Sequence, residues 1–211
     1  MADNRKELER AELHRAIWAI ADDLRGSVDG WDFKSYVLGM MFYRYISENL
    51  TNYINKNEHD TGNAAFDYRD ISDAAAESIR RQMVSSKGFF ILPSELFCNV
   101  RKKAPADENL NMTLDSVFKN IENSAKGSES EDDFSGLFDD IDVNSNKLGA
   151  TVAKRNKTLV QLMNGIGDMR LGQYRDNAID AFGDAYEYLM GMYASNAGKS
   201  GGEFFTPQEV S

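Results

Sequence analysis

A chain of 211 residues with a net charge of −10, 42% hydrophobic and 11% aromatic residues is long enough for one sizeable folded core. Its longest strongly apolar run, residues 36–46, falls well short of the roughly 20 apolar residues that a membrane helix needs, and the charged N-terminal segment does not resemble a signal peptide. One cysteine, Cys98, excludes an internal disulfide framework and a cysteine-rich zinc site, so a cytoplasmic location is expected.

The net negative charge of the chain is unfavourable for DNA binding. Phosphate backbones bind clustered Lys and Arg, so weak DNA affinity is expected for this chain alone. Two basic clusters depart from the general balance: residues 101–103, and Lys147 with Lys154, Arg155 and Lys157. Solvated helix ends are the simpler interpretation of both clusters, and contact with phosphates in an assembled complex is the alternative.

Two helices are predicted in the first quarter of the chain, because its apolar residues recur at the helical period. The first covers about residues 5–25 and is followed by Gly26 as a stop signal. The second covers about residues 32–56 with Asp32 as its N-cap, and its apolar residues face nearly every side, which predicts a central buried helix. The core-facing stripe of the first helix consists of Leu13, Ile17, Ile20 and Leu24.

The middle of the chain alternates between polar and apolar segments. A loop is predicted over 57–68, a helix over 72–86 and a short extended run over 89–92, which Pro93 ends. Residues 94–97 are predicted to begin another helix, and the helix after it is predicted to start with Thr113 as its cap. Its inner face is expected to consist of Leu114, Val117, Phe118 and Ile121.

An acidic segment and two further helices complete the predicted elements. In residues 129–142, seven of fourteen side chains are acidic, and Phe134, Leu137, Phe138 and Ile141 lie among them at helical spacing. A short helix is the favoured interpretation, and a mobile loop is the alternative. Helices are also predicted over 152–165 and 177–196. The predicted fold class is therefore all-α, an irregular bundle of about six to eight helices with at most a short strand or hairpin near 89–92.

Residues 201–210 combine several helix-start signals. Thr206 suits the N-cap, Pro207 the first helical position, and Glu209 completes a capping box with Thr206. A helix of about five residues cannot sustain itself. We therefore expect the natural chain to continue beyond its last residue, with a natural tail as the alternative.

The same stretch carries a family resemblance. Residues 201–207 resemble the glycine–aromatic–Thr-Pro motif of modification (M) subunits of type I restriction-modification systems, which in that family precedes the methyltransferase domain. Two departures are Gln208, where many relatives have Arg, and Ser94, where many have another proline. Four more stretches resemble the family in the same order, namely residues 17–26, 36–47, 88–93 and 184–189.

The resemblance implies a helical N-terminal domain over 1–196, then a linker and the start of an S-adenosyl-L-methionine-dependent methyltransferase domain over 197–211. Backbone amides at a helix start favour the cofactor's carboxylate, and aromatic rings can pack against its adenine. Packing of the two phenylalanines beneath the next domain is the alternative role. The cofactor-binding residues that the resemblance implies are Glu203, Phe204, Phe205, Thr206, Pro207 and Gln208.

The resemblance further implies that the intact protein is a site-specific, adenine-N6 DNA methyltransferase. In the family, two M subunits join one specificity (S) subunit, a restriction (R) subunit can be added, and the complex binds double-stranded DNA. No catalytic and no metal-binding residue is predicted here, because none of the three prolines belongs to an Asn/Asp-Pro-Pro-aromatic loop. A non-enzymatic helical protein–protein interaction module is the alternative, and a methyltransferase with its own recognition domain is a third possibility.

Several reactive or aromatic residues are expected to be structural. Cys98 lies beside Phe97 on an apolar helical face, which predicts a buried position. His14 and His59 have no ligand-like neighbours in sequence and are expected at the surface or in helix packing. A core role is favoured over base stacking for the aromatic cluster of Phe42, Tyr43 and Tyr45.

Overall fold

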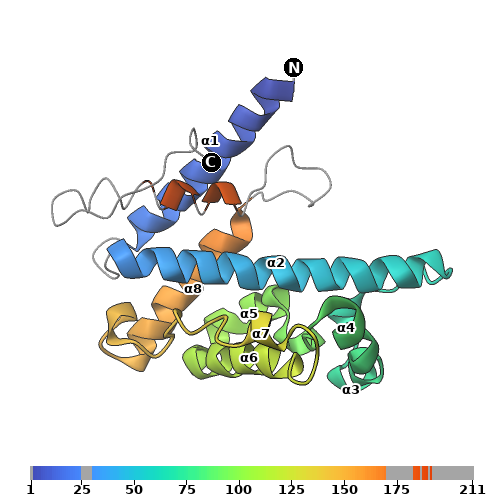
Figure 1. Ribbon diagram of the computed structural model, residues 1–211. Helices are drawn as coiled ribbons and strands as arrows, with labels where there is room; N and C mark the ends of the chain where they lie inside the picture. Colours follow the sequence, from blue (N-terminus) through green and yellow to red (C-terminus); the bar gives the residue numbers. More distant parts are fainter. Residues whose placement is uncertain (1, 25–29, 170–182, 186, 190, 192–211) are drawn as a thin grey trace.

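The computed structural model describes residues 2–24, 30–169, 183–185, 187–189 and 191 (Figure 1). Within these residues the protein is all-α: eight helices, α1 to α8, are joined by 3-10 turns and loops, and no strand is present. The described residues beyond position 182 are helical as well, and we call them the C-terminal stretch. The predicted fold class is confirmed.

The long helix α2 (Gly30–Asp60) forms the axis of the bundle, as Figure 1 shows. Tyr36, Val37 and Met40 are buried along it, which confirms the predicted central helix. The helix begins at Gly30, so the prediction of Asp32 as its N-cap is wrong. Asp32 lies in the first turn, where a carboxylate still favours the helix dipole, and it pairs with Lys147 at 2.9 Å.

Three helices pack against α2 to form the core. They are α5 (Phe97–Lys103), α6 (Leu110–Ser124) and α8 (Val152–Asp168), and α8 contacts α2, α5 and α6. The predicted inner face of α6 is buried, which confirms it. The predicted cap is wrong, because α6 starts earlier, and the Thr113 hydroxyl instead donates to Asp107 at 2.6 Å.

The predicted helix over 72–86 is broken into two. The first part is α3 (Asp73–Ala76), capped by the Ser72 hydroxyl, and the second is α4 (Arg80–Lys87); a 3-10 turn separates them. The Arg80 guanidinium holds Glu77 across this break, with Nε–Oε2 at 2.6 Å.

The extended run after α4 forms no ladder among the described residues. Phe90 and Ile91 are buried, and side chains satisfy their backbone. The Phe90 amide donates to Ser124 Oγ at 2.9 Å, and the Tyr68 hydroxyl donates to the Ile91 carbonyl at 2.7 Å. Since buried backbone groups need partners, these two bonds replace those that a neighbouring strand would supply. The Tyr68 hydroxyl comes from the 3-10 turn Tyr68–Asp70, which follows a loop.

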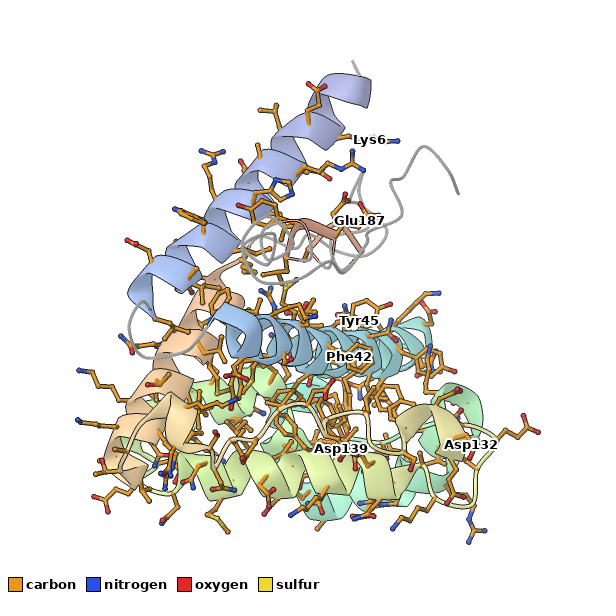
Figure 2. The ribbon with its side chains drawn as sticks, turned by 60° about the vertical axis from the view of Figure 1, so that its left-hand side comes forward. Lys6, Phe42, Tyr45, Asp132, Asp139 and Glu187 are labelled. Atoms are coloured by element: carbon orange, nitrogen blue, oxygen red, sulfur yellow. The ribbon has the colours of Figure 1, made fainter. Side chains whose placement is uncertain are left out.

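The acidic segment is anchored on the bundle by its apolar residues. Its only α-helical part is the single turn α7 (Glu131–Phe134), so the favoured helix forms in one turn and the rest consists of turns. Phe138 stacks on Phe118 with ring centroids 4.3 Å apart, and Ile141 is buried against Gly39. The acidic residues of this segment stay exposed, namely Asp132, Asp133, Asp139, Asp140 and Asp142. Figure 2 labels two of them, Asp132 and Asp139.

The remaining long helix, α1 (Ala2–Asp23), packs on α8 and rises away from the bundle (Figure 1). Its four predicted core residues are all buried, which confirms the stripe. The expected stop at Gly26 lies outside the described residues. Across the described part of the chain, no helix is long and apolar enough to cross a membrane, and no group of three or more possible metal ligands occurs.

Candidate functional site

The end of α8 is held by an arginine from α2. Arg44 Nη1 donates to the Ile166 carbonyl at 2.6 Å and to the Met169 carbonyl at 2.9 Å, while its Nε donates to Glu48 at 2.6 Å. The last carbonyls of a helix lack partners within the helix, and a cation there also interacts favourably with the negative end of the helix dipole. The Arg44 side chain is only 13% exposed, so it acts as a buried cap for α8.

A second arginine, from α5, binds the outer side of the same helix end. Arg101 Nε donates to Asn164 Oδ1 at 3.1 Å, and its Nη2 donates to Asp168. Gly167 makes room for this guanidinium, because a Cβ at that position would overlap it. Arg101 is therefore engaged within the protein, whereas its neighbours Lys102 and Lys103 are exposed.

Helix α1 approaches α8 closely at Gly165, shortly before the C-terminal end of α8. A Cβ on Gly165 would lie 2.5 Å from Ile20 Cγ1, so a larger residue there would force α1 away. Ile17 is completely buried at this contact region, and Leu13 is nearly so. The glycine thus sets the distance between the two helices.

The C-terminal stretch lies alongside α1, above α2; Figure 2 labels Glu187 on it. Arg10 Nε pairs with Asp184 Oδ1 at 2.6 Å, and the His14 ring stacks on Tyr188 with centroids 3.9 Å apart and planes 11° apart. Leu189 is fully buried. The contact therefore combines one ion pair, one ring stack and a small apolar interface.

The protonation equilibrium of the His14 imidazole favours the neutral form, because its pKa is lowered. Burial lowers the pKa of His14, while the Asp184 carboxylate acts in the opposite direction and Arg10 adds to the lowering. A neutral imidazole can stack face to face on Tyr188 without losing hydration of a charge. His14 thus packs between elements, as expected, and His59 bonds the Phe66 carbonyl through Nε2 at 2.8 Å.

The second basic cluster is partly occupied by contacts within the protein. Lys147 pairs with Asp32, and Arg155 Nη1 donates to Asn146 Oδ1 and to the Gly149 carbonyl, both at 3.2 Å. Lys154 and Lys157 are exposed on α8.

The expected burial of Cys98 and the expected core role of the aromatic cluster have different outcomes. Cys98 is exposed, so its predicted burial is wrong: Phe97 and Val100 turn inward from α5, and the position between them turns outward. Shielding of part of the thiol from solvent raises the pKa of Cys98, which keeps it protonated. Tyr43 is fully buried and donates to the Glu95 carbonyl, which confirms the core role for the centre of the aromatic cluster. Its other members, Phe42 and Tyr45, are half-buried (Figure 2).

The residues predicted to bind the cofactor, 203–208, lie outside the described residues. The structure instead draws attention to Arg44, which the sequence did not single out, and to Arg101, which the sequence marked only as a member of a basic cluster. A signal for Arg44 was available, since a lone charge inside an otherwise apolar helical run needs a partner. Arg101 gave no comparable signal, because a basic residue at a helix end is common.

Comparison with known families shows what meets where α1 contacts the C-terminal stretch, a contact that we call the junction. The family model "HsdM N-terminal domain" matches residues 13–166, and the model "N-6 DNA Methylase" matches residues 177–211. This chain belongs to the HsdM N-terminal domain family. The C-terminal stretch falls within the second match, and His14 of α1 contacts it from within the first, whereas Arg10 precedes the first match. The stack of His14 on Tyr188 therefore joins two parts of the chain that match different families.

Individual relatives agree with this assignment. The chain is 47% identical to the type I restriction enzyme MpnII methylase subunit of Mycoplasma pneumoniae, over 99% of this chain and 40% of the relative. It is 22% identical to the MjaIX methylase subunit of Methanocaldococcus jannaschii, over 94% and 34%. The crystal structure of a type I restriction-modification methyltransferase subunit from Streptococcus thermophilus superposes with a TM-score of 0.74 at 30% identity, covering 95% of this chain and 42% of that one. The chain thus spans less than half the length of these relatives.

Proposed function

We propose that this chain is the N-terminal part of the modification subunit of a type I restriction-modification DNA methyltransferase. The intact protein would transfer the methyl group of S-adenosyl-L-methionine to adenine N6 in a specific DNA sequence. The observation that supports this most is the order of the two family matches, 13–166 and then 177–211, along one chain. A purely non-enzymatic interaction module gives no reason for the second match.

The proposed role of the helical domain is to hold the methylase part and to contact partner subunits. The domain would cover 1–196, its last part from residue 177 onward already matching the methylase family model, with 197–211 as the linker and the start of the catalytic domain. Partners would be the S subunit, a second M subunit and the R subunit, and double-stranded DNA would be bound through the complex. A net charge of −10 supports this division, because an acidic domain should bind DNA weakly without basic partners.

The cofactor would be bound mainly by residues that follow this chain. Within it, Glu203, Phe204, Phe205, Thr206, Pro207 and Gln208 would form one wall of the S-adenosyl-L-methionine pocket. The cofactor would supply the methyl group, while backbone amides after Thr206 would face its carboxylate and the phenylalanines would pack on its adenine. We assign no catalytic residue to this chain, since the Asn/Asp-Pro-Pro-aromatic loop that holds a flipped adenine is absent from its sequence.

Methyl transfer tests the proposal. The intact protein, combined with its S subunit, is incubated with unmethylated DNA and S-adenosyl-L-methionine labelled in the methyl group, and label is measured in adenine. We expect incorporation with the intact protein and none when residues 1–211 replace it. Absence of transfer by the intact complex contradicts the enzymatic assignment, and label in cytosine contradicts the proposed adenine specificity. Micromolar binding of the cofactor to residues 1–211, measured by calorimetry, contradicts the division of roles.

A further inference from the structure

Trp18 is a large aromatic residue on the outer side of α1, and it is 52% exposed. It follows His14 by four residues, so the two side chains lie on neighbouring parts of one helix face. His14 is already covered by the C-terminal stretch through its stack on Tyr188. The exposed indole therefore continues a surface on which the methylase-matched segment is seated.

We propose that Trp18 is the anchor by which the rest of the methylase part docks on the helical domain in the intact protein. This inference rests on the proposed function, because it requires that the methylase part is present. Two observations select this occupant over others. The surface is continuous with the contact made by Asp184 and Tyr188, and more than half the length of the relatives lies outside the matched region.

The surroundings of Trp18 define what the occupant presents. Arg15, one turn before it, folds back along the helix and donates from Nε to the Ala11 carbonyl at 3.1 Å. Ala19 and Ala21 are small, so a facing surface can reach the indole ring from the side. Tryptophan has one donor, the indole N–H, and no acceptor. The docking surface should therefore offer an apolar pocket with a backbone or side-chain oxygen at its rim, the setting in which tryptophan contributes most to interfaces.

Hydrogen exchange of the α1 amides in residues 14–22 tests the proposal. It is measured in the intact protein and in residues 1–211, for wild type and for Trp18→Ala. In the intact protein, loss of the anchor should speed exchange about 30-fold, the change expected when one interface hot spot is removed. In residues 1–211 the same change should speed exchange far less, because half of the side chain is already exposed and alanine favours the helix. Trp18→Phe should give an intermediate rate in the intact protein.

Met112→Ala is the matched control. Met112 is 53% exposed, but it lies on α6, which Figure 1 places on the other side of α2 from α1. Its truncation should leave α1 exchange unchanged in both proteins.

Three results overturn the inference. Unchanged exchange in the intact Trp18→Ala protein shows that nothing docks there, and equal acceleration in residues 1–211 shows that Trp18 acts within the bundle. Sedimentation in which Trp18→Ala abolishes self-association of residues 1–211 shows that a second copy occupies the surface. Methyl transfer by the wild-type intact complex, measured alongside, separates these results from failure of the proposed function.

Discussion

The bundle around α2 and the junction around α1 are held together by different kinds of contact. In the bundle, Tyr43 is fully buried and its ring meets Phe97 and Phe118 edge-on, with centroids 5.4 and 5.5 Å away. At the junction, the C-terminal stretch is joined to α1 by the Arg10–Asp184 pair, in which Arg10 is half exposed, and by one ring stack, beside the buried Leu189. The comparison shows an aromatic and apolar core around α2 and a junction that combines polar contacts with a few buried apolar side chains.

The largest effect is expected from removing a core side chain. Leu114 on α6 is fully buried, so Leu114→Ala should lower the free energy of unfolding by about 2–5 kcal/mol through lost burial and a cavity. The exposed Met112 on the same helix provides the control, and Met112→Ala should change stability by less than about 0.5 kcal/mol. Urea denaturation of residues 1–211 measures both. Similar effects of the two substitutions would contradict the assignment of α6's inner face.

The next effect tests the cap that α2 supplies to α8, the helix on which α1 packs. Arg44→Ala should lower the free energy of unfolding by about 1–3 kcal/mol, because the Ile166 and Met169 carbonyls lose a charged donor at a position largely shielded from water. Urea denaturation gives the total cost, and hydrogen exchange along α8 should show the loss concentrated at its C-terminal end. Arg44→Lys should recover only part of it, since an ammonium lacks the planar fork of guanidinium. Full stability of Arg44→Ala would mean that α8 needs no cap from α2.

A smaller effect is expected at the junction itself. A double-mutant cycle with Arg10→Ala and Asp184→Ala should give a coupling of about 0.2–1 kcal/mol, because Arg10 is half exposed and solvent screens the pair. Thermal unfolding at low salt and at 1 M salt measures it, with weaker coupling at high salt. A coupling several times larger, or one insensitive to salt, would contradict the expectation that solvent screens this pair.

The smallest effect is a pH dependence at the far end of α2. Hydrogen bonding from Arg69 lowers the pKa of Asp67 to about 2, from an ordinary value of 3.8. A lowered folded-state pKa stabilises the protein fully above the unfolded value, and this stabilisation is lost as the pH falls from about 4 through 2. Asp67→Asn should therefore differ from wild type by at most about 1 kcal/mol near neutral pH, and by less at pH 2. An unfolding-free-energy difference that grows on acidification would contradict this.

The apolar stripes could be predicted from the sequence, because burial on a helix imposes its period on the residues themselves. Helix starts were less predictable. Asp32 and Thr113 both have the chemistry of a cap, yet Lys147 and Asp107 bind them in the folded chain. Lys147 is distant in sequence, so only the tertiary structure brings it to Asp32, whereas Asp107 lies in the turn just before α6. The family was recognisable from ordered motifs, but the junction was not. Its ion pair joins residues 174 positions apart, a separation that no local pattern contains.

The central proposal is that this helical bundle serves a DNA adenine methyltransferase. The most direct measurement is the N6-methyladenine content of DNA from cells that lack other adenine methylation and express the intact protein with its S subunit, determined by mass spectrometry. We predict N6-methyladenine at one recurring sequence, and its loss when residues 1–211 replace the intact protein. DNA without N6-methyladenine, from cells in which both intact subunits are folded and associated, would contradict the claim.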